Sequence, residues 1–202
     1  ISICDDCRRE LFDSNDRRFR YPFINCTNCG PRLTIIKDIP YDRPKTTMSE
    51  FNLCPDCASE YKDPSNRRFH AQPVACPTCG PKITFFSSGS RSSEGEEALK
   101  QTRDHLRQGR IIAIKGLGGY HIACDASNET SVAKLITNKH RSQKPLALMA
   151  FDLDHIRRHC SLTEEEGRLL TSPQHPVVLM HRLSYSKIAR STPALKCVRL
   201  PI

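Results

Sequence analysis

The sequence predicts a mixed α+β and α/β protein, in which two small zinc modules in tandem precede a partial, layered α/β domain. Three observations support this prediction. Eight of the eleven cysteines fall into two copies of the pattern C-x2-C-x18-C-x2-C. A segment rich in serine and glycine at 87–93 then separates this region from the rest of the chain. Beyond that segment, amphipathic helical patterns alternate with short apolar runs, which is typical of layered α/β domains.

The cysteine pattern recurs with an offset of 50 residues. The first copy contains Cys4, Cys7, Cys26 and Cys29, and the second contains Cys54, Cys57, Cys76 and Cys79. Other residues recur at the same offset, namely Glu10 with Glu60, Asp13 with Asp63, 17–19 with 67–69, and 30–31 with 80–81. Two C-x-x-C pairs supply four thiolates, which suit one tetrahedral zinc ion, so the copies predict two Zn²⁺ ions.

A set of four cysteines leaves no open coordination position, so both ions are expected to be structural. Disulfides are the alternative for such cysteines, but the spacing favours zinc. The spacing leaves two ligand arrangements open, because the pairs can serve one metal in sequence or interleave across the copies. His70 is expected to be a surface or packing residue, since the cysteine sets are already complete.

The charge is divided unevenly along the chain. The formal net charge is +9, and residues 91–202 contain 18 Lys and Arg against 11 Asp and Glu. After correction for thiolates and zinc, residues 1–90 carry a net charge of about −2. This argues against a basic zinc finger that grips nucleic acid and favours an anionic ligand for the second half. The arginine pairs at 17–18 and 67–68 are expected to pair with nearby carboxylates such as Asp13 and Asp63.

The zinc region is expected to span 1–86, with repeats at about 1–38 and 51–86 and an ordered connector at 39–44. A flexible linker is predicted at 87–93, and the α/β domain at 94–202. The elements expected in that domain are a helix begun by a Ser93–Glu96 capping box and ended at Gly109, a buried strand at 110–114, a glycine-rich turn at 115–119, a helix at 128–139, a strand at 145–150, helices at 152–160 and 163–171, and a strand at 177–180.

Three long cations lie close together between the helix at 128–139 and the strand that follows. Lys139, Arg141 and Lys144 fall within six residues, and loops at strand ends of α/β sheets are where ligands bind. Lysine meets phosphate as a point charge and arginine as a bidentate fork. Lys115, at the end of the first strand, is expected to converge on the same pocket. A solvated run of charges is the alternative interpretation.

Several segments together resemble the HypF family of [NiFe]-hydrogenase maturation carbamoyltransferases. They are 17–31, 69–73, 115–126 and 144–149, and the resemblance covers nearly the whole chain. It implies that the second half is a YrdC-like nucleotide-binding domain, of which 94–202 is the first part. It also implies that Lys139, Arg141 and Lys144 hold the triphosphate of ATP, with Mg²⁺ as the accompanying ion.

The resemblance further implies a reaction for the parent protein. Carbamoyl phosphate is converted to carbamate, carbamate and ATP give carbamoyl adenylate and pyrophosphate, and the carbamoyl group passes to a cysteine of the partner HypE. That group becomes the cyanide ligand of the hydrogenase iron. Free-standing YrdC proteins have Pro-Thr where this chain has Lys115-Gly116. The acylphosphatase and carbamoyl-transfer domains of the family and a later Ser-containing segment of its pocket have no counterpart in these 202 residues, so complete activity of this chain alone is not expected.

Two other function classes remain open on the sequence. The zinc region could be a docking module without catalysis, or the basic half could bind RNA, although aromatic residues are only 6% of the chain. No apolar stretch approaches the length of a transmembrane helix. A cytoplasmic location is expected from the resemblance.

Overall fold

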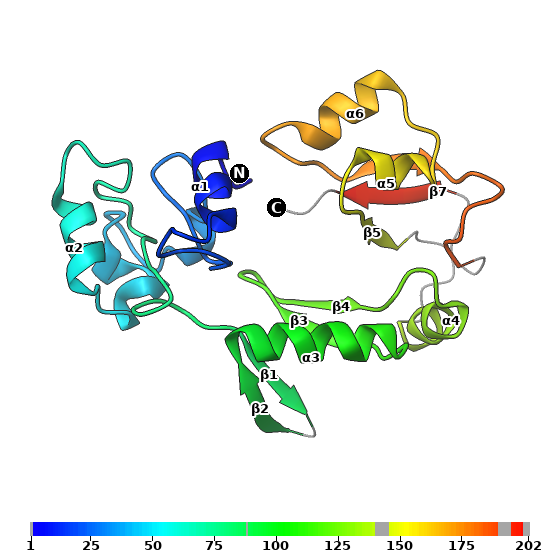
Figure 1. Cartoon of the computed structure of the whole chain (residues 1–202), viewed down its shortest axis with the longest axis horizontal. Coiled ribbons are helices and arrows are strands. Elements are labelled where there is room, and N and C mark those ends of the chain that lie inside the picture. Colours follow the sequence, from blue (N-terminus) through cyan, green and yellow to red (C-terminus); the bar gives the residue numbers. More distant parts are fainter. Residues whose placement is uncertain (1, 88, 140–145, 190–194, 200–202) are drawn as a thin grey trace. The chain divides into compact units, whose positions relative to one another are not determined.

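The chain folds into two units, which divide between Ile83 and Thr84, close to the predicted boundary at residue 86. A computed structural model describes residues 2–87, 89–139, 146–189 and 195–199 (Figure 1). Within the described residues, no helix combines the length and the apolar character that a bilayer span requires.

Two helices of the same length in the first unit begin at equivalent cysteines. Helix α1 spans Asp5–Phe12 with Cys4 as its N-cap, and α2 spans Pro55–Lys62 with Cys54 as its N-cap. Asp5 and Asp6 lie in the first turn of α1 and complement the positive end of the helix dipole. Three short 3-10 helices complete the unit at Leu33–Ile35, Arg43–Lys45 and Thr47–Glu50.

The buried core of this unit is small and contains metal-ligand candidates. Its members are Cys7, Tyr21, Ile24, Cys26, Cys29, Ile35, Met48 and Ala75. The connector predicted at 39–44 is ordered at its end, because the Arg43 guanidinium donates to the carbonyl oxygens of Gln72, Val74 and Phe51. The connector is thereby fixed to the second repeat by side-chain hydrogen bonds to its backbone.

The second unit begins with a hairpin where a flexible linker was predicted. Strands β1 (Thr84–Ser87) and β2 (Ser90–Glu94) pair antiparallel. Helix α3 (Gly95–Arg107) packs against both strands, and its His105 ring stacks on Phe85 with centroids 5.2 Å apart. The linker prediction at 87–93 is therefore wrong, because an aromatic anchor on β1 outweighs the serine and glycine content. The predicted capping box is also wrong, since Glu94 is the N-cap and the Ser93 hydroxyl donates to Gln101.

A second hairpin follows, formed by β3 (Ile112–Lys115) and β4 (Tyr120–Ala123). The glycine-rich turn thus joins two strands rather than a strand and a helix as expected. Helix α4 (Glu129–Asn138) matches the helix predicted at 128–139, and the Asn128 side chain caps it by accepting from the Ser131 amide. Gly109 ends the preceding helix with φ +75°, a conformation that favours glycine.

The last part of the unit is a three-stranded sheet in the order β5-β7-β6. Its strands are β5 (Ala147–Met149), β6 (Val178–His181) and β7 (Leu195–Arg199), with β7 parallel to β5 and antiparallel to β6. Helices α5 (Leu153–Arg157) and α6 (Glu164–Thr171) follow β5. The predicted strands are only partly buried, since Met149 and Leu179 are exposed, and β7 was not predicted because its segment follows a polar stretch.

Replacing Thr163 by alanine should destabilise the second unit by about 1 kcal/mol. Thr163 and Glu166 form the capping box that the sequence predicts at the start of α6, with each side chain bonded to the other's backbone amide. Thr163→Ala removes one of these acceptors and leaves a helix amide without its partner. Urea unfolding followed by circular dichroism measures the loss, and Thr163→Ser should retain most of the stability.

Candidate metal centres and nucleotide-binding residues

All eight cysteines of the repeated pattern are reduced, and they gather into two clusters. The first cluster is Cys4, Cys7, Cys26 and Cys29, and the second is Cys54, Cys57, Cys76 and Cys79. Within each cluster the sulfur atoms lie within 4.8 Å of one another. Each cluster is built from one repeat, so the sequential arrangement of ligands is confirmed and the interleaved alternative is excluded.

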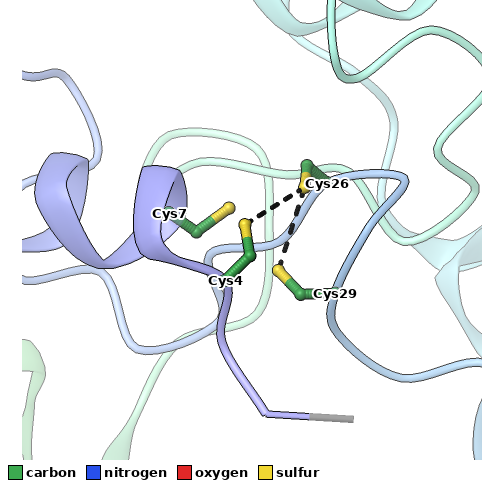
Figure 2. Close-up of side chains that lie close together, drawn as sticks. All are labelled: Cys4, Cys7, Cys26 and Cys29. Carbon is green, nitrogen blue, oxygen red and sulfur yellow. Dashed lines mark hydrogen bonds between the residues drawn. The ribbon is translucent and has the colours of Figure 1, made fainter. Parts of the chain in front are cut away.

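The sulfur spacing fits a zinc ion. Zinc–sulfur bonds of about 2.3 Å in a regular tetrahedron place sulfur atoms about 3.8 Å apart. The Sγ atoms of Cys4 and Cys26 are 3.6 Å apart and those of Cys26 and Cys29 are 3.9 Å apart (Figure 2). In the second cluster the Sγ atom of Cys76 lies 3.7 Å from those of both Cys54 and Cys79. A disulfide would need about 2.05 Å, so these are metal-ligand distances.

The local fold explains why the sulfurs converge. In the first cluster Cys4 and Cys7 come from the start of α1, and Cys26 and Cys29 come from a tight turn that faces it (Figure 2). A bridge-type pairing joins the backbones of Cys26 and Cys29, and the amide of Asn28 donates to the Cys26 sulfur at 3.3 Å. Gly30, directly after the turn, has φ +93°, which a residue with a side chain rarely adopts.

The thiols of the first cluster differ in pKa. The hydrogen bond from Cys7 lowers the pKa of the Cys29 thiol to about 4, while the same bond raises the pKa of Cys7. Zinc binds cysteine as the thiolate, so loading of the cluster releases thiol protons. Zinc affinity should therefore rise with pH.

Arginines from one repeat reach the sulfurs of the other. The Nη1 group of Arg67 donates to Cys7 Sγ at 3.0 Å, and the Nη2 groups of Arg17 and Arg18 donate to Cys57 Sγ at 3.3 and 3.4 Å. These contacts cover the sulfurs of Cys7 and Cys57 and would stabilise their thiolates once zinc is bound. Covered thiolates in a complete set of four support a structural role for the metal rather than a catalytic one.

The same arginines pair with two glutamates, not with the aspartates that the sequence suggested. Arg17 and Arg18 pair with Glu60, and Arg67 and Arg68 pair with Glu10. Burial alone would raise the pKa of Glu10, but hydrogen bonds from Arg68 and Arg67 outweigh it and the pKa is lowered. The prediction that the arginines pair with carboxylates is confirmed, but the predicted partners, Asp13 and Asp63, are wrong.

The aspartates are unsuitable partners because they are used locally. Asp13 accepts a hydrogen bond from the amide of Asn15, and Asp63 accepts from Ser65. Each glutamate instead lies one helical turn after a cysteine ligand, at Glu10 after Cys7 and at Glu60 after Cys57. The recurrence of these glutamates at the same offset as the arginines was the signal that could have identified the pairs.

Among the described side chains outside the repeated pattern, His70, Cys124 and Cys160 belong to neither cluster. His70 is exposed, and its ring stacks on Tyr61 with centroids 5.1 Å apart, which confirms a packing role. Burial raises the pKa of the Cys124 thiol, so this cysteine is poorly suited to act as a nucleophile. Asp125 accepts from the amide and hydroxyl of Ser127 and thus caps a turn.

The structure describes half of the predicted nucleotide-binding residues. Lys115 ends β3, is exposed, and has its Nζ atom 5.0 Å from the centroid of the Tyr120 ring. Lys139 is the exposed C-cap of α4. Arg141 and Lys144 lie outside the described residues. Convergence of the four cations on one pocket therefore stays a prediction.

Two family models match the chain. One, described as the HypF finger, matches residues 3–36 and 53–86, which are the two metal clusters with their flanks. The other, described as telomere recombination and named for Sua5, YciO and YrdC, matches residues 104–201. A carbamoyltransferase HypF of Synechocystis is 56% identical over 183 residues, which cover 90% of this chain and 24% of that protein.

The chain belongs to the HypF family. The crystal structure of HypF from T. kodakarensis matches the whole chain with a TM-score of 0.93 and 46% identity, and the match covers 27% of that protein. A full-length HypF in a phosphate- and nucleotide-bound form matches with a TM-score of 0.87 and 43% identity over 26% of its length. The chain thus spans about a quarter of the length of its HypF relatives.

Proposed function

We propose that this chain contributes the zinc unit and part of the adenylating domain to a carbamoyltransferase that acts in [NiFe]-hydrogenase maturation. The parent protein would convert carbamoyl phosphate to carbamate, form carbamoyl adenylate from carbamate and ATP, and pass the carbamoyl group to HypE. The observation that carries the proposal is the presence, in one chain, of two HypF-type zinc clusters and a YrdC-type segment. The nucleotide in a HypF structure of 43% identity supports the choice of ATP as substrate.

The adenylation step defines what the cations must do. A carbamate oxygen attacks the α-phosphorus of ATP, the bond to the bridging oxygen breaks, and pyrophosphate leaves with the electron pair of that bond. Lys139, Arg141 and Lys144 would neutralise the charge that gathers on the departing pyrophosphate, and Mg²⁺ would accompany the nucleotide. Lys115 would add a fourth cation, and the family fold would hold the reactants in line.

The parent protein should lose carbamate-dependent exchange between ATP and pyrophosphate when Arg141 is replaced by alanine. A fall of ~100-fold or more is expected, as for other groups that stabilise developing charge. Arg157→Ala is the matched control, because Arg157 is exposed and pairs only one turn away with Asp154 among the described contacts. Equal exchange rates in Arg141→Ala and Arg157→Ala would contradict the role of the basic segment.

The zinc unit would have an architectural role in this enzyme. Each set of four cysteines would fill the coordination shell of one zinc ion, and arginines contact the sulfurs of Cys57 and Cys7, so the unit would offer no open metal position. It would hold neighbouring domains or HypE in place. Deletion of residues 1–86 from the parent protein should then weaken HypE binding in a pull-down assay, while adenylate formation continues. Unchanged HypE binding would exclude the partner role.

A further inference from the structure

In each metal cluster of the first unit, a cysteine sulfur accepts a hydrogen bond from an arginine of the opposite repeat. Arg67, in the second repeat, donates to the sulfur of Cys7 in the first cluster. Arg17, in the first repeat, donates to the sulfur of Cys57 in the second cluster. We propose that these crossed arginines couple the two clusters, so that zinc in one cluster raises the affinity of the other for zinc.

The buried arginines connect the two halves of each ligand set. Arg18 is 1% exposed; it donates through Nη2 to Cys57 Sγ and through Nε to the Ala75 carbonyl, at 2.9 Å. Ala75 directly precedes the ligand Cys76. One side chain of the first repeat therefore holds both C-x-x-C pairs of the second cluster in position.

Arginines of the second repeat make the equivalent contacts with the first cluster. The Nε group of Arg68 donates to the Asn25 carbonyl at 3.2 Å, and Asn25 directly precedes the ligand Cys26. Its neighbour Arg67 contacts Cys7. The pair at 67–68 thus spans both C-x-x-C pairs of the first cluster. Residues 25 and 75 are equivalent under the 50-residue repeat, so the exchange is reciprocal.

The crossed arginines face the charge of a loaded cluster. Four thiolates around Zn²⁺ carry a formal charge of −2. Glu10 or Glu60 adds a negative charge beside each cluster. A hydrogen bond to an ionised acceptor is roughly twice as strong as one between neutral groups. In a loaded first cluster Arg67 therefore bridges two anionic groups, the Cys7 sulfur and the Glu10 carboxylate.

Each cluster should therefore bind zinc more tightly when the other cluster is loaded than when the other cluster is empty. Zinc in the first cluster fixes Arg67 and Arg68, and thereby orders the chain that leads to Cys76 and Cys79. Zinc in the second cluster fixes α2 and Ala75, which receive Arg17 and Arg18. Coupling between two sites is reciprocal and typically changes affinity by about 5- to 150-fold. We expect a change in this range.

Native mass spectrometry of the 202-residue chain during zinc titration tests the coupling. Independent sites of equal affinity would make the singly loaded chain the commonest species at half saturation. Coupled sites should make that species the rarest, with metal-free and doubly loaded chains in excess. A singly loaded chain that dominates at half saturation would overturn the proposal.

Arginine variants test whether the crossed contacts carry the coupling. The double variant Arg17→Gln with Arg67→Gln should restore the singly loaded species, and the corresponding lysine variants should restore it in part, because lysine lacks the fork that bridges sulfur and carboxylate. Arg9→Gln is the control, since Arg9 is exposed and pairs with Asp6 on its own helix. Coupling that persists in the double Gln variant would overturn the arginine route.

A ligand variant provides a second, independent measurement. Cys29→Ser disables the first cluster and leaves Cys7 in place. Chelator competition should then show that the second cluster binds zinc about 5- to 150-fold more weakly than in the unaltered chain. Cys79→Ser should weaken the first cluster by the same factor. Unchanged zinc affinity in the intact cluster of either variant would contradict the proposal.

Discussion

Chelation of zinc should unfold residues 1–83 and leave residues 84–202 folded. The core of the first unit is small and includes Cys7, Cys26 and Cys29 themselves, so apolar burial cannot support it alone. Structural zinc contributes about 10–16 kcal/mol of binding free energy per ion in small zinc modules. This is comparable to or greater than the whole stability of a typical domain, so its loss should be decisive.

Hydrogen exchange with mass spectrometry on the whole chain measures both units in one experiment. After treatment with a chelator, peptides from α1 and α2 should exchange at the rate of an unfolded chain, while peptides from α3 and α4 keep their protection. The second unit thus serves as the internal control, and addition of Zn²⁺ should restore the first. Protection of α1 and α2 that survives metal removal would show that the clusters are not needed for folding.

The cysteines made the metal centres predictable, because zinc imposes strict requirements on ligand number and spacing. The eight ligands follow from two short C-x-x-C pairs in each repeat, whereas the sequential arrangement was chosen between two open alternatives only by the structure. The capped helix at α6 was predictable for a similar reason, since the Thr163–Glu166 box depends only on residues three apart. Local rules of this kind can be read from a single sequence.

Contacts between segments that are distant in the sequence were harder to predict. The arginines were assigned to Asp13 and Asp63 because those residues are close in sequence, whereas the repeats cross and bring Glu60 and Glu10 to them. The segment at 87–93 has the composition of a linker, but strand pairing and packing against α3, with Phe85 stacked on His105, place it in a hairpin. Strand β7 lies in a polar context, and pairing with β5 and β6 decides its conformation.

Arg18→Met should destabilise the zinc-loaded first unit by about 3–5 kcal/mol. Arg18 is 1% exposed and donates to Glu60, to the Ala75 carbonyl and to Cys57 Sγ. Methionine fills much of the same space but provides no donor. The buried Ala75 carbonyl then loses the Arg18 donor, while Glu60 and Cys57 lose one of their donors and keep Arg17. The expected loss comes from these missing hydrogen bonds rather than from missing packing.

Denaturant unfolding at a fixed concentration of free Zn²⁺, followed by circular dichroism, measures this loss. Arg9→Met is the matched control, because its side chain is 73% exposed and should change stability by no more than about 0.5 kcal/mol. If Arg18→Met were no more costly than Arg9→Met, the buried arginine would not be holding the two repeats together. Arg68→Met should reproduce the effect, because Arg68 is 3% exposed and makes the equivalent contacts with Glu10 and the Asn25 carbonyl.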